Sequence, residues 1–205
     1  MYTFAELARD IERSTPSLGS GHLTVVDGPA GSGKTTFAAN LAAASIDAQV
    51  LHMDDLYEGW SGGLTPDVWQ RLHDQVLRPL AEGRHGRYQH YDWRLGQLGV
   101  WRDVPLRSRI VLEGVGAAER SVDPLASLRV WVEADPALRL ARGIARDGAA
   151  MTSHWLRWMR LEAAHFAKDE TKARADLVVD GASMSAGRPE SYVVIEDRRP
   201  TRDGS

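Results

Sequence analysis

Cysteine is absent from this chain of 205 residues. Without it there can be no disulfide, no thiolate nucleophile and no zinc–thiolate site. The sequence also lacks any apolar run of about 18 residues, and Met1–Ser14 carries acidic residues where a signal peptide would carry basic ones. We therefore expect a cytoplasmic protein that has no membrane partner.

A basic excess is missing as well, because the formal net charge is -3. Proteins whose main partner is nucleic acid usually carry a positive excess, so we expect a small-molecule partner and no nucleic acid. The apolar fraction of 43% is enough for one ordinary globular core. We expect a single domain over residues 1–196 and a charged, disordered tail over 197–205, and the oligomeric state is left open.

What the chain does contain is a phosphate-binding loop, Gly-Pro-Ala-Gly-Ser-Gly-Lys-Thr, at residues 28–35. An apolar run over 22–27 precedes it and a helix-forming run over 35–44 follows, so the loop ends at a helix N-terminus, where free backbone N–H groups bind phosphate. We expect Lys34 to reach the β- and γ-phosphates of ATP and Thr35 to ligate Mg²⁺. The residues expected to hold the nucleotide are Gly28, Pro29, Ala30, Gly31, Ser32, Gly33, Lys34, Thr35 and Thr36.

Strand-like and helix-like patterns alternate along the rest of the chain. Such alternation predicts an α/β three-layer fold of the P-loop NTPase type, with a five-stranded parallel sheet and helices on both faces. The expected strands cover residues 22–27, 48–53, 109–115, 128–132 and 176–180, with a further edge strand over 192–195. The expected helices cover residues 3–11, 35–44, 66–83, 136–147 and 152–168.

Acidic side chains follow three of the expected strands. Ligands of an open parallel sheet bind beyond the carboxyl ends of its strands, so we expect Asp54 and Glu113, on strands flanking the P-loop strand, to face the γ-phosphate and Mg²⁺ from either side. Asp54 would orient the acceptor hydroxyl and accept its proton, and both acids would serve the metal. The alternative is that Asp54 and Glu113 are helix caps or solvent-facing strand ends. For Asp27 and Asp55 this alternative is as well supported as a functional role.

Arg139, Arg142 and Arg146 lie three and four residues apart, which places them on one face of a helix. In isolation such a stripe is typical of a solvated surface. Beside a P-loop it favours a small helical lid, over about residues 139–160, that neutralises the charge of the migrating phosphoryl group and excludes water. We expect Arg139 and Arg142 to contact the nucleotide, and Arg142 and Arg146 to act in catalysis.

The chain is rich in tryptophan, with seven such residues. Five of them lie in segments that follow strands or flank the expected lid, namely Trp60, Trp93, Trp101, Trp155 and Trp158. Aromatic faces suit a planar acceptor ring. The helical spacing of Trp155 and Trp158 is nonetheless more typical of a core.

The order of these motifs over residues 20–181 resembles the uridine kinase-like P-loop kinases. The segments that carry the resemblance are residues 27–35, 53–57, 91–93, 111–114 and 139–147. The resemblance implies a nucleoside-kinase-like fold and an ATP- and Mg²⁺-dependent kinase that phosphorylates a hydroxyl of a nucleoside or nucleoside-like molecule. It places Asp54 on the catalytic base and Glu113 on the Mg²⁺-linked carboxylate. It also places Tyr57 beside the acceptor, and Tyr91 and Trp93 against its base.

Two departures from that family fall in the acceptor half. Uridine–cytidine kinases carry an acid where this chain has Leu64-Thr65-Pro66, and a histidine where it has Arg94-Leu95-Gly96. The family's residues for the phosphoryl donor, ATP, therefore have counterparts in this chain, whereas its residues that identify the acceptor do not. Two other classes stay open: a P-loop ATPase or nucleotide-sensing regulator with no small-molecule acceptor, and a binding domain that has lost the chemistry.

Overall fold

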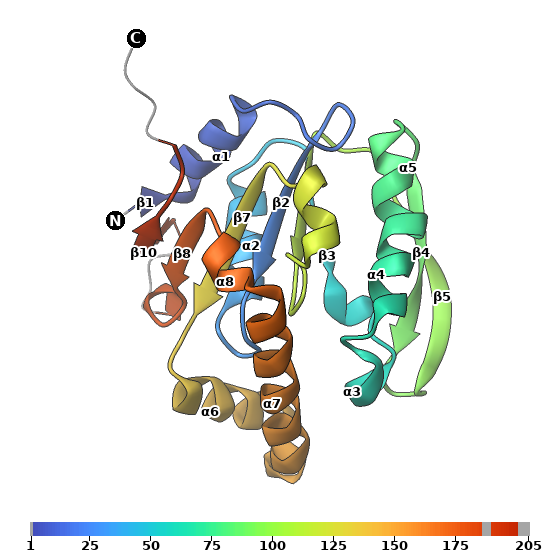
Figure 1. Ribbon diagram of the computed structural model, residues 1–205, viewed down its shortest axis with the longest axis vertical. Helices are drawn as coiled ribbons and strands as arrows, with labels where there is room; N and C mark the ends of the chain where they lie inside the picture. Colours follow the sequence, from blue (N-terminus) through green and yellow to red (C-terminus); the bar gives the residue numbers. More distant parts are fainter. Residues whose placement is uncertain (1, 186–189, 201–205) are drawn as a thin grey trace.

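The computed structural model describes residues 2–185 and 190–200, and a six-stranded sheet forms its centre (Figure 1). Five strands run parallel, in the spatial order β3 (Ala48–His52), β6 (Arg109–Glu113), β2 (His22–Asp27), β7 (Leu128–Glu133) and β8 (Leu177–Asp180). The last strand, β10 (Val194–Asp197), joins β8 in the antiparallel direction. The predicted α/β fold with five parallel strands is confirmed, and the edge strand expected at 192–195 forms two residues later as a sixth.

Both faces of this sheet are covered by helices, because successive side chains of a strand point to opposite faces. Val25 and Leu112 belong to one core, with the helices that follow β3. Val26 and Val111 belong to the other, with the P-loop helix and the N-terminal helix. The helices named are α4 (Pro66–Leu72) and α5 (Arg78–Ala81) on the first face, and α1 (Phe4–Glu12) and α2 (Lys34–Ala43) on the second.

The helix expected over 66–83 is interrupted by a wider turn. Between α4 and α5 the backbone forms a π-helical segment, η2 (His73–Leu77). Pro79 lies two residues after η2; it lacks an N–H donor and its ring crowds the carbonyl one turn earlier, which disfavours a regular α-helix there. Leu72, Val76, Leu77 and Leu80 stay buried on the core side despite the interruption.

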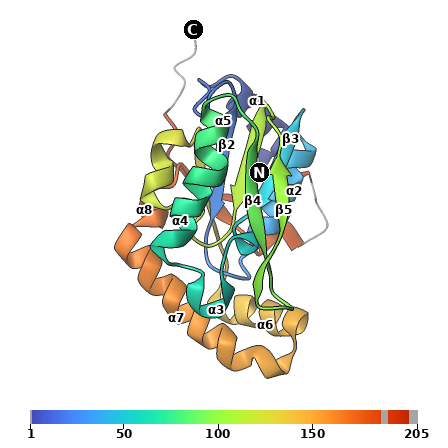
Figure 2. The same ribbon diagram turned by 90° about the vertical axis from the view of Figure 1, so that its right-hand side faces the viewer.

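The polar, aromatic stretch after α5 forms an antiparallel hairpin, β4 (Gly86–Asp92) and β5 (Gln97–Val104). The hairpin stands beside α4 and α5 in Figure 2. Asp55, in the 3-10 turn η1 (Met53–Asp55), ties it to the end of β3: its carboxylate accepts a hydrogen bond from the Tyr88 hydroxyl at 2.8 Å and pairs with Arg102 at 2.7 Å. Asp55 thus positions the hairpin.

The segment after β7 forms two helices that project beyond the sheet, at the bottom of Figure 1. They are α6 (Pro136–Asp147) and α7 (Thr152–Asp169), joined by the short turn η4 (Ala149–Met151). The expected lid over 139–160 corresponds to α6 and the first half of α7. A single turn, α8 (Thr171–Arg174), then leads into β8.

The two terminal segments of the chain lie close together. β1 (Tyr2–Thr3) pairs with β9 (Ser191–Tyr192), and Asp197 still belongs to β10. Arg198 donates to the Lys172 carbonyl at 2.7 Å, and Arg199 pairs with Asp10 at 3.2 Å. Residues 197–199 therefore do not form the disordered tail that we expected to begin at 197. Residues 201–205 lie outside the described residues. In the described part of the chain, no helix has the length and apolar character needed to cross a bilayer.

Candidate active site

The P-loop joins the end of β2 to the start of α2, as expected, and its backbone requires glycine at several positions. Gly28, Gly31 and Gly33 have φ values of 139°, 78° and 108°, in the region that L-residues with a side chain avoid. A Cβ on Gly28 would lie 2.1 Å from the Val132 carbonyl oxygen, and one on Gly31 would lie 2.6 Å from that of Arg139. The loop is therefore pressed against β7 and α6.

The first turn of α2 has the features of an anion-binding site. Its N-terminus carries no side-chain cap, so the backbone N–H groups of that turn are left for a ligand. Lys34 is the first helical residue, is mostly buried, and donates from Nζ to the Pro29 carbonyl at 3.0 Å. The ammonium is thus held over the loop that would wrap a polyphosphate.

A cleft of about 700 Å³ opens at the carboxyl ends of the strands. The half beside the P-loop includes Gly33, Lys34, Thr35, Thr36, Arg142 and Gly181. Its other half includes Asp54, Trp60, Trp93, Arg146, Trp155 and Trp158. Glu113 lies between the two halves, so one continuous space joins the P-loop to the predicted acceptor residues.

A hydroxyl, a carboxylate and an imidazole meet where β6 approaches α2. The Thr35 hydroxyl donates to Glu113 Oε1 at 3.1 Å, and His52 Nδ1 lies 2.6 Å from the same oxygen. That hydrogen bond raises the pKa of His52, and burial together with the charge of Glu113 raises the pKa of Asp54. A cation near the two acids would relieve their repulsion.

This donor set fits Mg²⁺ bound together with phosphate. Mg²⁺ typically uses one or two carboxylates, several waters and phosphate oxygens, and Thr35 and Glu113 supply a hydroxyl and a carboxylate beside the P-loop. Among the described residues no group of three or more His, Asp or Glu side chains forms a cage that would hold a metal without the nucleotide.

The sheet order corrects one expectation about the two acids. β6 is a direct neighbour of β2, but β3 lies on the far side of β6. Asp54 and Glu113 therefore approach the P-loop from the same side of β2. The strand on the other side, β7, leads instead into α6 and its arginines.

Asp27, the acid directly before the P-loop, is fully buried and does not line the cleft. Its carboxylate accepts three backbone N–H groups, from Gly28 at 2.6 Å, Gly116 at 3.0 Å and Ala118 at 2.9 Å. Burial nevertheless raises the pKa of Asp27 to about 6. Asp27 thus fixes the turn after β6 against the P-loop.

A pH-dependent stability follows from Asp27. The folded protein holds this proton up to about pH 6, whereas the unfolded chain releases it near pH 4, so stability falls as the pH rises between these values. From pH 5 to pH 7 we expect the wild type to lose about 1 kcal/mol of unfolding free energy relative to Asp27→Asn, which cannot ionise. Urea unfolding of both proteins at the two pH values measures the difference. Parallel pH dependences would contradict the assignment.

Arg139 lies outside the cleft, although it belongs to the predicted arginine stripe. It is buried and pairs with Glu162 of α7 at 2.8 Å, and it also donates to the Ala30 carbonyl at 3.4 Å. Glu162 accepts the Ala30 N–H at 2.8 Å through its other oxygen. The pair holds both polar groups of one P-loop residue, and we call Arg139, Glu162 and Ala30 the P-loop clamp.

Glu162→Gln should loosen the P-loop clamp, because glutamine has one acceptor oxygen where two are used. Breaking a buried pair of this kind costs about 3 kcal/mol of unfolding free energy. We expect that loss in denaturant unfolding and a raised KM for ATP in steady-state kinetics. The matched control is Glu170→Gln, since Glu170 is exposed and pairs with Arg120 on the surface. Its effect should stay below about 1 kcal/mol, and equal losses in both variants would argue against the clamp.

The other two arginines reach the cleft. Arg142 donates to the P-loop carbonyl of Gly31 at 3.2 Å and to the Gly181 carbonyl at 3.3 Å, so it bridges the P-loop and the segment after β8 at the edge of the cleft. Arg146 lies further along α6, pairs with Asp147 at 2.8 Å and stands 5.6 Å from the Trp155 ring centroid. Arg157 and Arg160 are exposed on α7, away from the cleft.

The predicted acceptor aromatics are placed unequally. Trp93 lines the cleft and donates its indole N–H to the Asp54 carbonyl at 2.9 Å. Tyr57 also lines the cleft, but it is buried and its hydroxyl donates to the Val115 carbonyl. Tyr91 does not line it and instead packs edge-on against Trp93, with ring centroids 5.5 Å apart. Trp155 and Trp158 are buried as expected for a core, yet both border the cleft.

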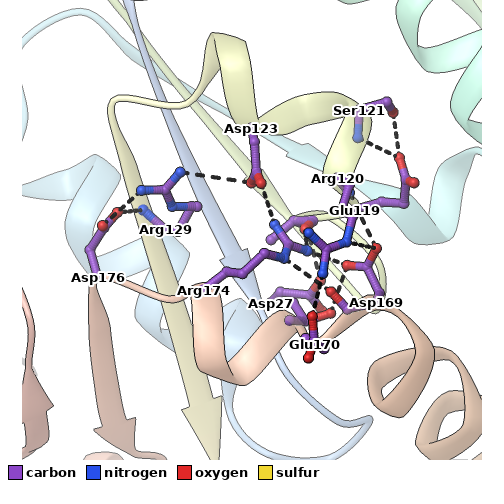
Figure 3. Close-up of polar contacts among 12 residues, drawn as sticks. Asp27, Glu119, Arg120, Ser121, Asp123, Arg129, Asp169, Glu170, Arg174 and Asp176 are labelled. Atoms are coloured by element: carbon purple, nitrogen blue, oxygen red, sulfur yellow. Dashed lines mark hydrogen bonds and ion pairs between the residues drawn. The ribbon is translucent and has the colours of Figure 1, made fainter.

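A second network, drawn in Figure 3, joins the end of α7 to the P-loop strand. Arg174 pairs with Asp169 and with Asp123, at 2.5 Å for the latter, and donates to the Ala118 carbonyl at 2.8 Å. The N–H of Ala118 donates in turn to Asp27. Ala118 therefore links the α7–α8 corner to the Asp27 carboxylate that precedes the P-loop. Neither Glu162 nor Arg174 stood out in the sequence, because both lie outside recognisable motifs.

Comparison with known proteins identifies a matching family and similar folds. The model of the phosphoribulokinase / uridine kinase family matches residues 68–179. A structure described as a possible uridine kinase from Bacillus stearothermophilus has a TM-score of 0.63 at 22% identity and covers 85% of this chain and 96% of that chain. A candidate fructose transport system kinase from Silicibacter sp. TM1040 gives 0.54 at 21%, covering 91% and 95%. These two likenesses concern the fold.

One curated protein is also similar in sequence. The inorganic pyrophosphatase TTM2 of Arabidopsis thaliana is 28% identical over 132 residues, which are 61% of this chain. The match spans only 20% of that protein's length.

Proposed function

Because the chain belongs to the phosphoribulokinase / uridine kinase family, we propose that it is an ATP- and Mg²⁺-dependent kinase that transfers the γ-phosphoryl group to a hydroxyl of a small molecule. The observation that carries the proposal is that a P-loop with Lys34 and Thr35 shares one cleft with Asp54. A hydrolase needs no enclosed second half beyond the phosphate site, whereas a kinase must hold an acceptor there.

Each side chain has a role in this transfer. A bond forms between the acceptor oxygen and the γ-phosphorus while the bond to the β,γ-bridging oxygen breaks, and Asp54 orients the hydroxyl and takes its proton. Lys34, the loop amides and the guanidinium groups of Arg142 and Arg146 would stabilise charge on the moving group. Thr35 and Glu113 would hold Mg²⁺, which when bound would neutralise charge on the β- and γ-phosphates.

The surroundings of Asp54 support its role as the base. It faces the cleft, and burial by the walls together with Glu113 raises its pKa. A carboxylate with a raised pKa accepts a proton more readily than a free one. Its backbone carbonyl is fixed by Trp93, so the turn that carries it is held in place.

Two narrower parts of the proposal concern the extent of the domain and the lid. Residues 1–196 would act as one domain, and residues 139–160 would close over bound nucleotide as a lid. The absence of cysteine supports a cytoplasmic location. The family supports a nucleoside or nucleoside-like acceptor, or another small alcohol.

An ADP-release assay tests the proposal. The purified protein is given ATP and Mg²⁺ with and without a pooled set of nucleosides, vitamins and sugars. A kinase releases ADP in proportion to an acceptor in the pool. Acceptor-independent release would show an ATPase instead, and the absence of release with retained ATP binding would show a regulator or binding domain.

A further inference from the structure

The acceptor half of the cleft is walled by four tryptophans from three separate parts of the chain. Trp60 comes from α3 (Gly59–Gly62), Trp93 from the β4–β5 turn, and Trp155 and Trp158 from α7. The Trp60 ring centroid lies 5.8 Å from that of Trp93, 6.4 Å from Trp155 and 6.0 Å from Trp158. All three pairs are edge-to-face, which is a stable arrangement of indoles and gives a preformed aromatic wall.

Several polar atoms along this wall are already used by the protein. Tyr57 donates its hydroxyl to the Val115 carbonyl, and Trp93 donates its indole N–H to the Asp54 carbonyl. Trp155 donates to Asp147 at 2.9 Å, and the same carboxylate also holds Arg146. A ligand with several hydroxyls would have to give up water there without gaining equivalent partners, which is unfavourable for each group left unpaired.

The Asp54 carboxylate lines the cleft at the end of this wall nearest the P-loop. It can accept a hydrogen bond from one hydroxyl held beside the position of the γ-phosphate. Beyond Asp54, apart from the Arg146 guanidinium, the wall offers mainly ring faces and edges, which favour a flat ring with few polar substituents.

We propose that the acceptor is a flat aromatic or heteroaromatic alcohol that presents a single hydroxyl to Asp54 and lays its ring against the four tryptophans. This inference rests on the proposed kinase function and narrows it, since a polyhydroxylated sugar ring is disfavoured. The replacement of the acid and the histidine of uridine–cytidine kinases by Leu64-Thr65-Pro66 and Arg94-Leu95-Gly96 is in accord with it.

Calorimetric titration tests the ligand class without requiring turnover. The full chain, with a non-hydrolysable ATP analogue and Mg²⁺, is titrated with indole-3-ethanol, uridine and D-ribose. We expect indole-3-ethanol to bind at least about tenfold more tightly than uridine, and ribose not to saturate the site. Tighter binding of uridine or ribose than of indole-3-ethanol would overturn the inference.

Two tryptophans of the hairpin provide a matched pair of variants. Trp93 borders the cleft and Trp101 lies outside it, and their side-chain exposures are similar, at 41% and 47%. Trp93→Ala should weaken binding of indole-3-ethanol by about tenfold, whereas Trp101→Ala should leave it unchanged. Trp93→Phe should retain most of the affinity, because a ring remains although the hydrogen bond to Asp54 is lost. Equal effects of Trp93→Ala and Trp101→Ala would contradict the proposed wall.

ADP release measured with the same three alcohols separates this inference from the kinase assignment. If uridine stimulates release and indole-3-ethanol does not bind, the kinase function stands and the aromatic acceptor is overturned. If indole-3-ethanol binds in a Trp93-dependent way but no alcohol stimulates release, the ligand class stands and the kinase function is overturned.

Discussion

Asp54→Asn is expected to lower kcat by at least about a hundredfold and to leave the fold and the affinity for ATP nearly unchanged. Asparagine keeps the size of the side chain but cannot take the proton of the acceptor hydroxyl. The backbone carbonyl that accepts the Trp93 indole N–H is unaffected, so the turn should keep its position. Steady-state ADP release with a stimulating alcohol measures kcat, and calorimetry with an ATP analogue measures nucleotide binding.

The pH dependence gives the Asp54 variant a second readout. Burial and the charge of Glu113 raise the pKa of Asp54, so wild-type turnover should fall as acid protonates this carboxylate. In Asp54→Asn that fall should disappear from the residual activity. Asp74→Asn is a suitable control. Asp74 lies half-exposed on η2, outside the cleft, and forms an ion pair with Arg78 one turn further along. Full acceptor phosphorylation by Asp54→Asn would remove the proposed base.

Lys34→Ala is the second substitution for which we expect a large loss, of at least about a hundredfold in turnover. The ammonium is held against the loop by the Pro29 carbonyl, and alanine would leave the β- and γ-phosphates without this charge. Because the charge is required both in the ground state and as the phosphoryl group moves, KM for ATP should rise while kcat falls.

A surface lysine provides the comparison for Lys34→Ala. Lys168 is exposed on α7, and Lys168→Ala should change neither parameter measurably. Thermal unfolding should show both variants folded, since Lys34 occupies the first turn of α2 and alanine is a good helix former. Wild-type kinetics in Lys34→Ala would mean that the loop does not hold the triphosphate.

The sequence predicted the local features of this cleft better than its connections. The P-loop, the acids at the strand ends and the arginine stripe were recognisable because each depends on a short pattern beside a strand or helix. Strand order is different, because it depends on crossover connections, and β3 was assigned to the wrong side of β6 for that reason. Glu162 could not be found by local pattern, since 132 residues separate it from Ala30.

The arginine stripe shows the same limit on a smaller scale. Arg139, Arg142 and Arg146 share one helical face, but the distance of each from the P-loop depends on where α6 leaves the sheet. Arg139 is therefore buried in the P-loop clamp, Arg142 reaches loop carbonyls and Arg146 stands beside Trp155. The spacing of the three arginines identified the helical face that they share. Their three different environments depend on how α6 packs against the P-loop and α7.

Helix α7 is anchored to the P-loop and its strand by its C-terminal half, and its N-terminal half extends away from the sheet. Its 18 residues span about 27 Å, and its contacts with the P-loop and with the network of Ala118 and Asp27 come from Glu162 and from the corner that follows Asp169. The outer end has its own contacts, the hydrogen bond from Trp155 to Asp147 and the packing of Trp158 on Tyr57, so a displacement that breaks these and keeps the inner contacts would pivot near Glu162. Trp155 and Trp158 lie on this outer part of α7. Such a displacement would therefore widen or narrow the aromatic wall and at the same time strain the P-loop clamp at Ala30.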